Sequence, residues 1–181
     1  SKKQSVIKIK NFLNNTSNYK SNLIFFALLF KNETDLKQVK ESISRDYGKI
    51  IKESPVYEFN HSAYYSTEMG EPLYRQFIGI GASLSPPNYW TIKHWATELE
   101  THFTTNDKRT INIDPGIIHA HNAIFFSTKD FAHRLPIGHQ IYAEVSLIYK
   151  KKKFHALDWT YPDMTKKEIL DFFSDFRKCL L

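Results

Sequence analysis

The sequence predicts an α+β fold, a two-layer sandwich with helices mostly on one face of a mainly antiparallel sheet. The chain has 181 residues, of which 41% are hydrophobic, and this suffices for one domain with a buried core. Strand-like and helix-like segments alternate up to residue 108, and strand-like segments then follow one another to about residue 157. This order is compatible with a ferredoxin-like core that is extended at one edge.

The basic charge is concentrated at the start of the chain. The formal net charge is +6, and residues 1–22 hold five lysines and no acidic residue. The rest of the chain has 20 basic and 19 acidic residues, so it is nearly neutral. We therefore expect a flexible basic arm over residues 1–21 and a single globular domain over residues 22–181.

The first core elements are a strand and a helix. The continuous apolar run LIFFALLF (23–30) indicates a strand that is covered on both faces. A helix over 33–47 follows, with Asn32 or Thr34 as its N-cap and Gly48 in the left-handed conformation at its end.

Two further strands and a second helix complete the first half. Residues 49–59 and 74–84 alternate as strands, and Gly79 leaves room for the close approach of a helix or ligand. Ser85 and Pro86 open a helix over 87–103.

The second half predicts consecutive strands and a last helix. The expected strands are 109–114, 117–127, 138–149 and 153–157. In the third, alternation places one apolar stripe on one face and Glu144 on the other; the stripe consists of Ile141, Ala143, Val145, Leu147 and Tyr149. Thr165 and Glu168 form a capping box at the start of a helix over 165–180, which we expect on the same face as the other two.

Five unusual polar strings lie between residues 113 and 163. They are IDPG (113–116), HAH (119–121), STKDFAHR (127–134), GHQIYAEV (138–145) and LDWTYPD (157–163). Together with YYSTEMGEPLYRQF (64–77), they resemble an uncharacterised prokaryotic domain family, a domain of unknown function that is often loosely labelled GTP-binding. The resemblance covers about residues 22–178, departs from the family pattern at Ile117 and Gln140, and implies no established activity.

The GTP label has no support from a phosphate-binding motif. A P-loop needs the pattern GxxxxGK[ST], and the six glycines of the chain do not form it. Thr128-Lys129-Asp130 resembles a guanine-reading motif but lacks its intervening residue.

A cluster of cationic and titratable residues indicates a candidate site. Lys129, His133 and Arg134 combine an ammonium group, an imidazole and a guanidinium within six residues, which suits a phosphate or carboxylate oxyanion. We expect His133, Glu144 and Asp114 as acid/base groups and a set of ligand-binding residues: Lys129, Arg134, Asp130, Tyr142, Trp159 and Tyr161. The alternative is a buried salt-bridge set, in which Glu144 and Asp130 neutralise Arg134 and Lys129.

Other candidate sites are weaker. His119 and His121 share one face of a strand and would need His133 or Asp114 to hold a metal, so surface histidines are the favoured interpretation and no metal site is predicted. The chain has a single cysteine, Cys179, so an internal disulfide is excluded. We interpret Cys179 as a buried core residue rather than a nucleophile.

The sequence thus favours a cytoplasmic protein that binds or processes a phosphorylated small molecule or nucleotide. The alternative is a non-catalytic protein- or RNA-binding module that uses the basic arm and exposed aromatic residues. No membrane contact is expected, and whether the protein is an enzyme, which cofactor it uses and how it oligomerises are left open.

Overall fold

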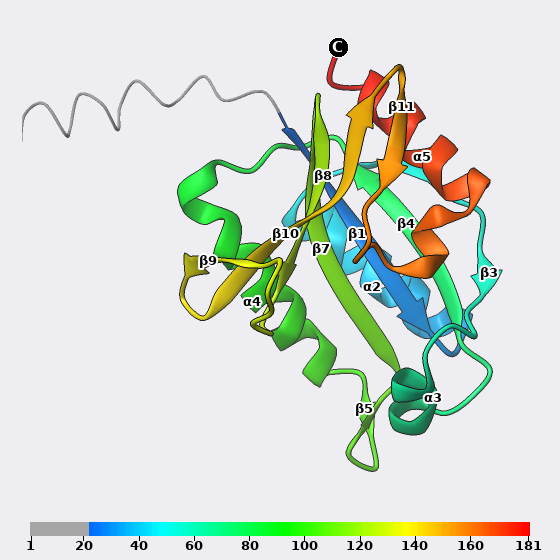
Figure 1. Ribbon diagram of the computed structural model, residues 1–181. Helices are drawn as coiled ribbons and strands as arrows, with labels where there is room; N and C mark the ends of the chain where they lie inside the picture. Colours follow the sequence, from blue (N-terminus) through cyan, green and yellow to red (C-terminus); the bar gives the residue numbers. More distant parts are fainter. Residues whose placement is uncertain (1–21) are drawn as a thin grey trace, which may run out of the picture.

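The computed structural model describes residues 22–181 as a sheet flanked by helices, and the predicted arm 1–21 lies outside the described residues (Figure 1). The helices are α2 (Glu33–Asp46), α3 (Ala63–Met69), α4 (Tyr89–Thr101) and α5 (Lys167–Lys178). Two 3-10 helices span Pro86–Asn88 and Pro162–Thr165. The strands are β1 (Asn22–Phe30), β2 (Ile50–Glu53), β3 (Tyr57–Glu58), β4 (Tyr74–Ile80), β5 (Thr104–Thr105), β6 (Lys108–Arg109), β7 (Ile111–His119), β8 (Asn122–Ser127), β9 (Leu135–Gly138), β10 (Ile141–Lys150) and β11 (Lys153–Ala156).

The main sheet has the order β11-β10-β8-β7-β1-β4-β2, with β3 beside β4 and β9 beside β10, and every pairing is antiparallel. The order β7-β1-β4-β2, with α2 and α4 as the connecting helices, is that of a ferredoxin-like core. Strands β8, β10 and β11 extend it beyond β7. The predicted α+β class and the extended antiparallel sheet are confirmed.

Strand β1 lies in the middle of the core and is apolar on both faces. Phe26 and Leu28 belong to the cluster that packs against α2 and α4, whereas Phe25 and Ala27 belong to the cluster on α5. Burial of one such large side chain contributes roughly 1.5–3 kcal/mol. The strand therefore needs cover on both sides.

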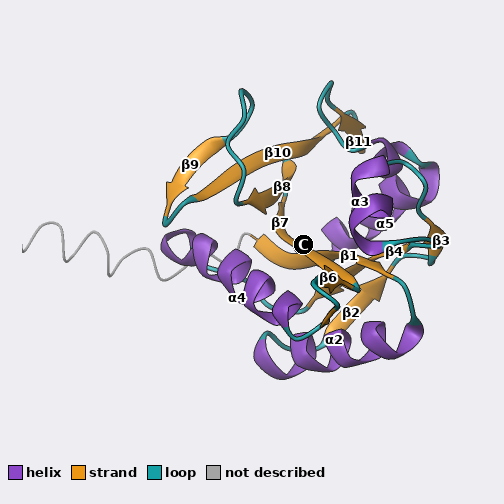
Figure 2. Ribbon diagram, turned by 90° about the horizontal axis from the view of Figure 1, so that it is seen from below, coloured by secondary structure: helices purple, strands orange, loops and turns teal. Residues whose placement is uncertain are grey.

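The helices cover both faces of β1. Figure 2 shows α2 and α4 on one side of the sheet and α5 on the other. The prediction that helix 165–180 shares a face with the other two is wrong, because β1 leaves a second apolar face to be covered. A Cβ atom added to Gly79 would come within 2.5 Å of the Phe176 ring, so the close helix approach expected at this glycine is confirmed.

The helix ends agree with the predicted capping in one case and differ in another. Asn32 caps α2 by accepting a hydrogen bond from the Asp35 amide at 2.8 Å, and Gly48 has a φ of +117°. At α5 the predicted capping box is wrong, because Thr165 belongs to the preceding 3-10 helix and donates to the Pro162 carbonyl. Cys179 is exposed rather than buried, because it follows the last turn of α5.

Two strand predictions also need correction. Strand β7 runs without a break through Asp114-Pro115-Gly116, where we expected it to end. Proline lacks a backbone N–H, but β8 does not pair with β7 at Pro115, so no hydrogen bond between these strands is lost there. In β10 a bulge between Val145 and Leu147 interrupts the alternation. Ile141 consequently faces the α4 side and Leu147 the α5 side, so the predicted single stripe does not exist.

No helix among the described residues is long and apolar enough to cross a membrane.

Candidate anion-binding cavity

The extended sheet splits open between β7 and β8. Strand β7 pairs with β1 along its whole length but with β8 only from Gly116 to Ile118. Beyond that point β8 pairs with β10 alone. This part of the sheet lies toward β9 and away from the start of β7 (Figure 1). Residues 111–115 of β7 therefore have no strand neighbour on the β8 side.

Side chains of α4 occupy the place of the missing strand. The Ile113 amide donates to Glu100 Oε2 at 3.2 Å, and Lys93 Nζ donates to the Ile113 carbonyl at 3.4 Å. A backbone amide and carbonyl buried without partners would be costly, so these contacts explain why a helix face that packs on the sheet contains charged residues.

A polar cavity of about 260 Å³ lies at this split. Its walls come from α3, α4, β6, β7, the segment from Ser127 to Arg134 and the loop before the second 3-10 helix. The lining residues are Tyr64, Tyr65, Lys93, Thr97, Glu100, Arg109, Asn112, Asp114, Ser127, Thr128, Lys129, Arg134 and Tyr161.

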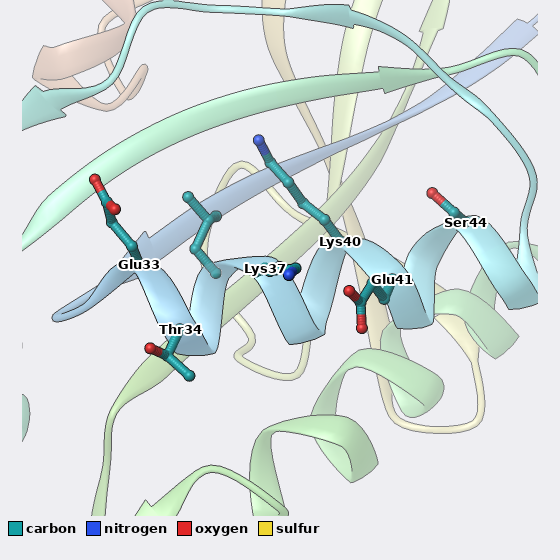
Figure 3. A pocket seen from close by; sticks show the side chains of 7 residues that line it. Glu33, Thr34, Lys37, Lys40, Glu41 and Ser44 are labelled. Carbon is teal, nitrogen blue, oxygen red and sulfur yellow. The ribbon is translucent and has the colours of Figure 1, made fainter.

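A larger hollow of about 890 Å³ lies along the outer surface of α2 (Figure 3). All of its lining residues come from this one helix, and the charge of Lys40 is already compensated by an ion pair with Glu53 at 2.8 Å. Because no second element brings side chains toward a common point, we take the smaller cavity as the candidate site.

The structure brings four of the sequence-predicted residues together in this cavity. They are Asp114, Lys129, Arg134 and Tyr161. Lys129 Nζ lies 4.7 Å from the centroid of the Tyr64 ring. Arg134 Nη1 donates to the Lys129 carbonyl at 3.0 Å, which fixes the guanidinium beside the lysine.

Two of the predicted acid/base residues lie behind this wall. Glu144 is 2% exposed and contacts His133 Nε2 at 2.5 Å and Arg134 Nε at 3.3 Å. Ser146, at the β10 bulge, donates to its other oxygen at 2.8 Å. The His133 ring stacks on Trp159 with centroids 5.0 Å apart and does not line the cavity. These residues are positioned to orient Arg134.

The salt-bridge alternative is correct for one pair and not for the other. Glu144 does neutralise Arg134, but Asp130 is exposed and forms no ion pair with Lys129 or any other described residue. Tyr142 and Trp159 also lie outside the cavity lining, and the Trp159 indole donates to the Val145 carbonyl at 2.8 Å.

Several lining residues were missed by the sequence analysis. Lys93, Thr97 and Glu100 have the spacing i, i+4, i+7, which places a polar row beside the apolar stripe of α4. Asn112 lies two residues before the predicted Asp114 and so shares its side of β7. Both patterns are visible in the sequence, and they signal a polar strip on a helix and a strand that otherwise belong to the core.

The carboxylates of the cavity are held by fixed cations. Arg109 contacts Glu100 Oε2 and Glu68 Oε1, each at 2.6 Å, and Lys93 Nζ lies 3.2 Å from Asp114 Oδ1. Burial alone would raise the pKa of Asp114, but the charges of Lys93 and Arg75 and a hydrogen bond from Asn112 hold this pKa below its usual range. Asp114 is therefore ionised at neutral pH.

Glu100 has the opposite electrostatic balance. Burial raises the pKa of its carboxyl group to about 7, because Lys93 and Arg109 offset the loss of hydration only in part and Asp114 adds a like charge. Burial, and next the charge of Asp114, raise the pKa of both Tyr65 and Tyr161. The two phenols thus stay protonated and can donate hydrogen bonds into the cavity.

The last residue of the WTYPD string belongs to a separate buried ion pair. Asp163 accepts hydrogen bonds from Arg75 Nε at 3.0 Å and from Tyr57 Oη at 2.8 Å, and none of the three lines the cavity.

Among residues 22–181 no group of three or more histidine, cysteine or acidic side chains could hold a metal. His119 lies 3.4 Å from Tyr89 Oη, and burial lowers its pKa.

The comparisons with known proteins concern the whole domain. Neither the curated proteins nor the solved structures contain a match to this chain. A family model described as "Domain of unknown function (DUF4416)" matches residues 20–179, nearly all of the chain. This confirms the resemblance to an uncharacterised domain family, and the chain belongs to the DUF4416 family.

Proposed function

We propose that the cavity between β7 and β8 binds the phosphate group of a small phosphorylated molecule. The observation that carries the proposal is the charge of the lining. Four cationic side chains, Lys93, Arg109, Lys129 and Arg134, line one cavity with two carboxylates, Glu100 and Asp114. Two further carboxylates outside the lining, Glu68 and Glu144, pair with Arg109 and Arg134. Lys129 is the one cation of this lining without an ion pair among the described residues, and an oxyanion beside it and Arg134 would supply the missing negative charge.

The two walls of the cavity differ in how their charges are compensated. On the α4 and β7 side, Lys93 and Arg109 are each paired with a carboxylate at 3.2 Å or less. On the other side, Lys129 makes no ion pair among the described residues. Arg134 is paired with Glu144 through Nε at 3.3 Å, but its Nη2 makes no hydrogen bond within the described residues. We therefore assign the phosphate to the wall formed by Lys129 and Arg134.

The size of the cavity limits the ligand. Sites that enclose drug-sized molecules measure roughly 300–1,000 Å³. A cavity of about 260 Å³ encloses a phosphate and a small organic group, or the phosphate end of a nucleotide. Tyr64 is 57% exposed beside the cavity and offers a ring face to whatever extends beyond it.

The test compares two lysines with the same local contact. Lys129→Gln removes the unpaired charge from the cavity, and Lys166→Gln removes a lysine that lies over the Tyr57 ring at 4.2 Å, outside the cavity. Titration calorimetry with inorganic phosphate and with AMP should show binding to the wild type. We expect about tenfold weaker binding for Lys129→Gln, equivalent to about 1.4 kcal/mol, and wild-type affinity for Lys166→Gln.

Two results would contradict the proposal: no binding of either ligand to the wild type at millimolar concentration, or equal losses in both variants. Binding of RNA or of a protein without any phosphorylated small molecule would support the non-catalytic module instead, for which exposed aromatic side chains such as Phe131 are available. We propose the cytoplasm as the location of the binder, because a single cysteine suits a reducing compartment, and a prokaryotic source, which the family resemblance implies.

A further inference from the structure

Glu100 is the carboxyl group of the cavity whose two oxygens have different environments. Its side chain is 5% exposed and lines the cavity from α4. Oε2 is fixed by Arg109 Nη1 at 2.6 Å and by the Ile113 amide at 3.2 Å. Oε1 makes no hydrogen bond to any described residue. One oxygen is therefore held in place, while the other is free to contact a ligand.

The charged and titratable groups around Glu100 come from every neighbouring wall. Lys93 lies on the same helix, Arg109 on β6 and Asp114 on β7, and Arg109 is shared with Glu68 of α3 at 2.6 and 2.8 Å. The other charged and titratable groups of the lining are Tyr64, Tyr65, Lys129, Arg134 and Tyr161. Sharing Arg109 between two carboxylates weakens its hold on Glu100, since one guanidinium then compensates two negative charges.

The two carboxyl groups of the lining consequently differ in protonation. Asp114 receives hydrogen bonds on both oxygens, from Lys93 Nζ and from Asn112 Nδ2 at 2.8 Å, and is ionised. Glu100 is buried and exchanges its proton near neutral pH. A pair of carboxyl groups with pKa values set apart in this way can supply one acceptor and one donor to the same ligand.

We propose that Glu100 is an anion-binding residue in its protonated form and donates the hydrogen on Oε1 to an oxygen of the bound phosphate. The inference rests on the proposed function. The proton comes from the solvent and stays on Oε1 while the anion is bound, so the cavity takes up the anion and a proton together. Ionised Glu100 would repel the ligand, whereas protonated Glu100 leaves Asp114 as the only negative charge of the lining.

The proposal predicts a specific pH dependence of anion affinity. Below about pH 7 Glu100 already holds its proton and affinity is constant. Above this pH each bound anion must bring a proton with it, so affinity falls by up to about tenfold for each pH unit.

The experiment uses sulfate, because it does not titrate near neutral pH as phosphate does. Calorimetry at about pH 8 in two buffers of different ionisation enthalpy measures the protons taken up with each sulfate. We expect nearly one proton for the wild type and none for Glu100→Gln, whose affinity should stay constant between about pH 6 and pH 8. Glu98→Gln changes an exposed carboxylate of the same helix and should behave as the wild type.

The possible outcomes separate this inference from the proposed function. Sulfate binding without proton uptake in the wild type overturns the role of Glu100 and leaves the anion site intact. Uptake that persists in Glu100→Gln assigns the proton to another group and also overturns it. If neither sulfate nor phosphate binds, both proposals fail. The wild-type proton count does not depend on whether the variant folds.

Discussion

Two clusters of opposite charges differ in what surrounds them. In the first, Arg75 and Asp163 have side chains 5% and 1% exposed, and the Arg75 guanidinium lies 4.8 Å from the centroid of the Phe59 ring. In the second, Arg109 and Glu100 lie beside the open edge of β7 and line a cavity. The chemical groups are of the same kind, but only the second cluster can be reached by a ligand.

The balance of charges differs as well. The first cluster joins one cation to one carboxylate, with Tyr57 as a further hydrogen-bond donor. The cavity lining has four cations and two carboxylates, Glu68 and Glu144 pair with two of the cations from outside the lining, and Lys129 has no ion pair among the described residues. The comparison therefore separates a cluster that stabilises the fold from one that is suited to bind an anion, and the following changes test this separation.

The largest effect is expected from Asp163→Ala. This change leaves Arg75 buried without its carboxylate, and removal of one partner of a buried pair costs about 3–5 kcal/mol. Urea unfolding should show this loss of free energy, with exposed Asp158→Ala as the control. Anion affinity of the folded fraction should not change. A loss below about 1 kcal/mol would show that the first cluster does not stabilise the fold as we describe.

The next largest effect concerns Glu100 and pH. Its pKa of about 7 in the folded protein lies above the ordinary value of 4.5, so the folded state keeps a proton that the unfolded state has already lost. Wild-type stability should fall between about pH 4.5 and pH 7, by an amount on the order of 3 kcal/mol. Glu100→Gln should lack this fall. Parallel pH profiles for the two proteins would show that Glu100 is ionised in the folded state.

Arg134→Ala should affect both stability and binding, because Arg134 belongs to the cavity and also contacts Glu144. We expect a loss of about 1–3 kcal/mol in the free energy of unfolding, since Glu144 keeps its contacts with His133 and Ser146. Phosphate affinity should fall at least as much as in Lys129→Gln. If the variant loses stability but binds phosphate normally, Arg134 is structural only.

The smallest effect is expected from Asp130→Asn. Asp130 is exposed, makes no ion pair among the described residues and lies outside the cavity lining. Stability should change by less than about 0.5 kcal/mol, and phosphate affinity should stay the same. A clear change in affinity would mean that the segment between β8 and β9 moves Asp130 toward the ligand.

Local sequence patterns predicted the elements better than their placement. The run LIFFALLF, the Asn32 cap and the small residue at Gly79 each depend on neighbours in the chain, and each was identified correctly. The apolar stripe of α5 shows that the helix is covered, but not which face of the sheet covers it. The bulge at Ser146 was hidden because Val145 and Leu147, on either side of it, are both apolar and so continue a regular alternation in the sequence.

The candidate site shows the same limit. Lys129, Arg134, Asp114 and Tyr161 were found because their strings are unusual for loops. Lys93, Glu100 and Arg109 were missed because they come from a helix and a short strand that meet the others only in three dimensions. The separation of β8 from β7, which creates the cavity, has no signal in the sequence that we can identify.

The most direct test of the central claim is a crystal structure of the protein grown with phosphate or sulfate. The account predicts an anion between β7 and β8, with Lys129 Nζ and the Arg134 guanidinium within about 3 Å of its oxygens. An anion that binds elsewhere on the domain while this cavity holds only water would contradict it.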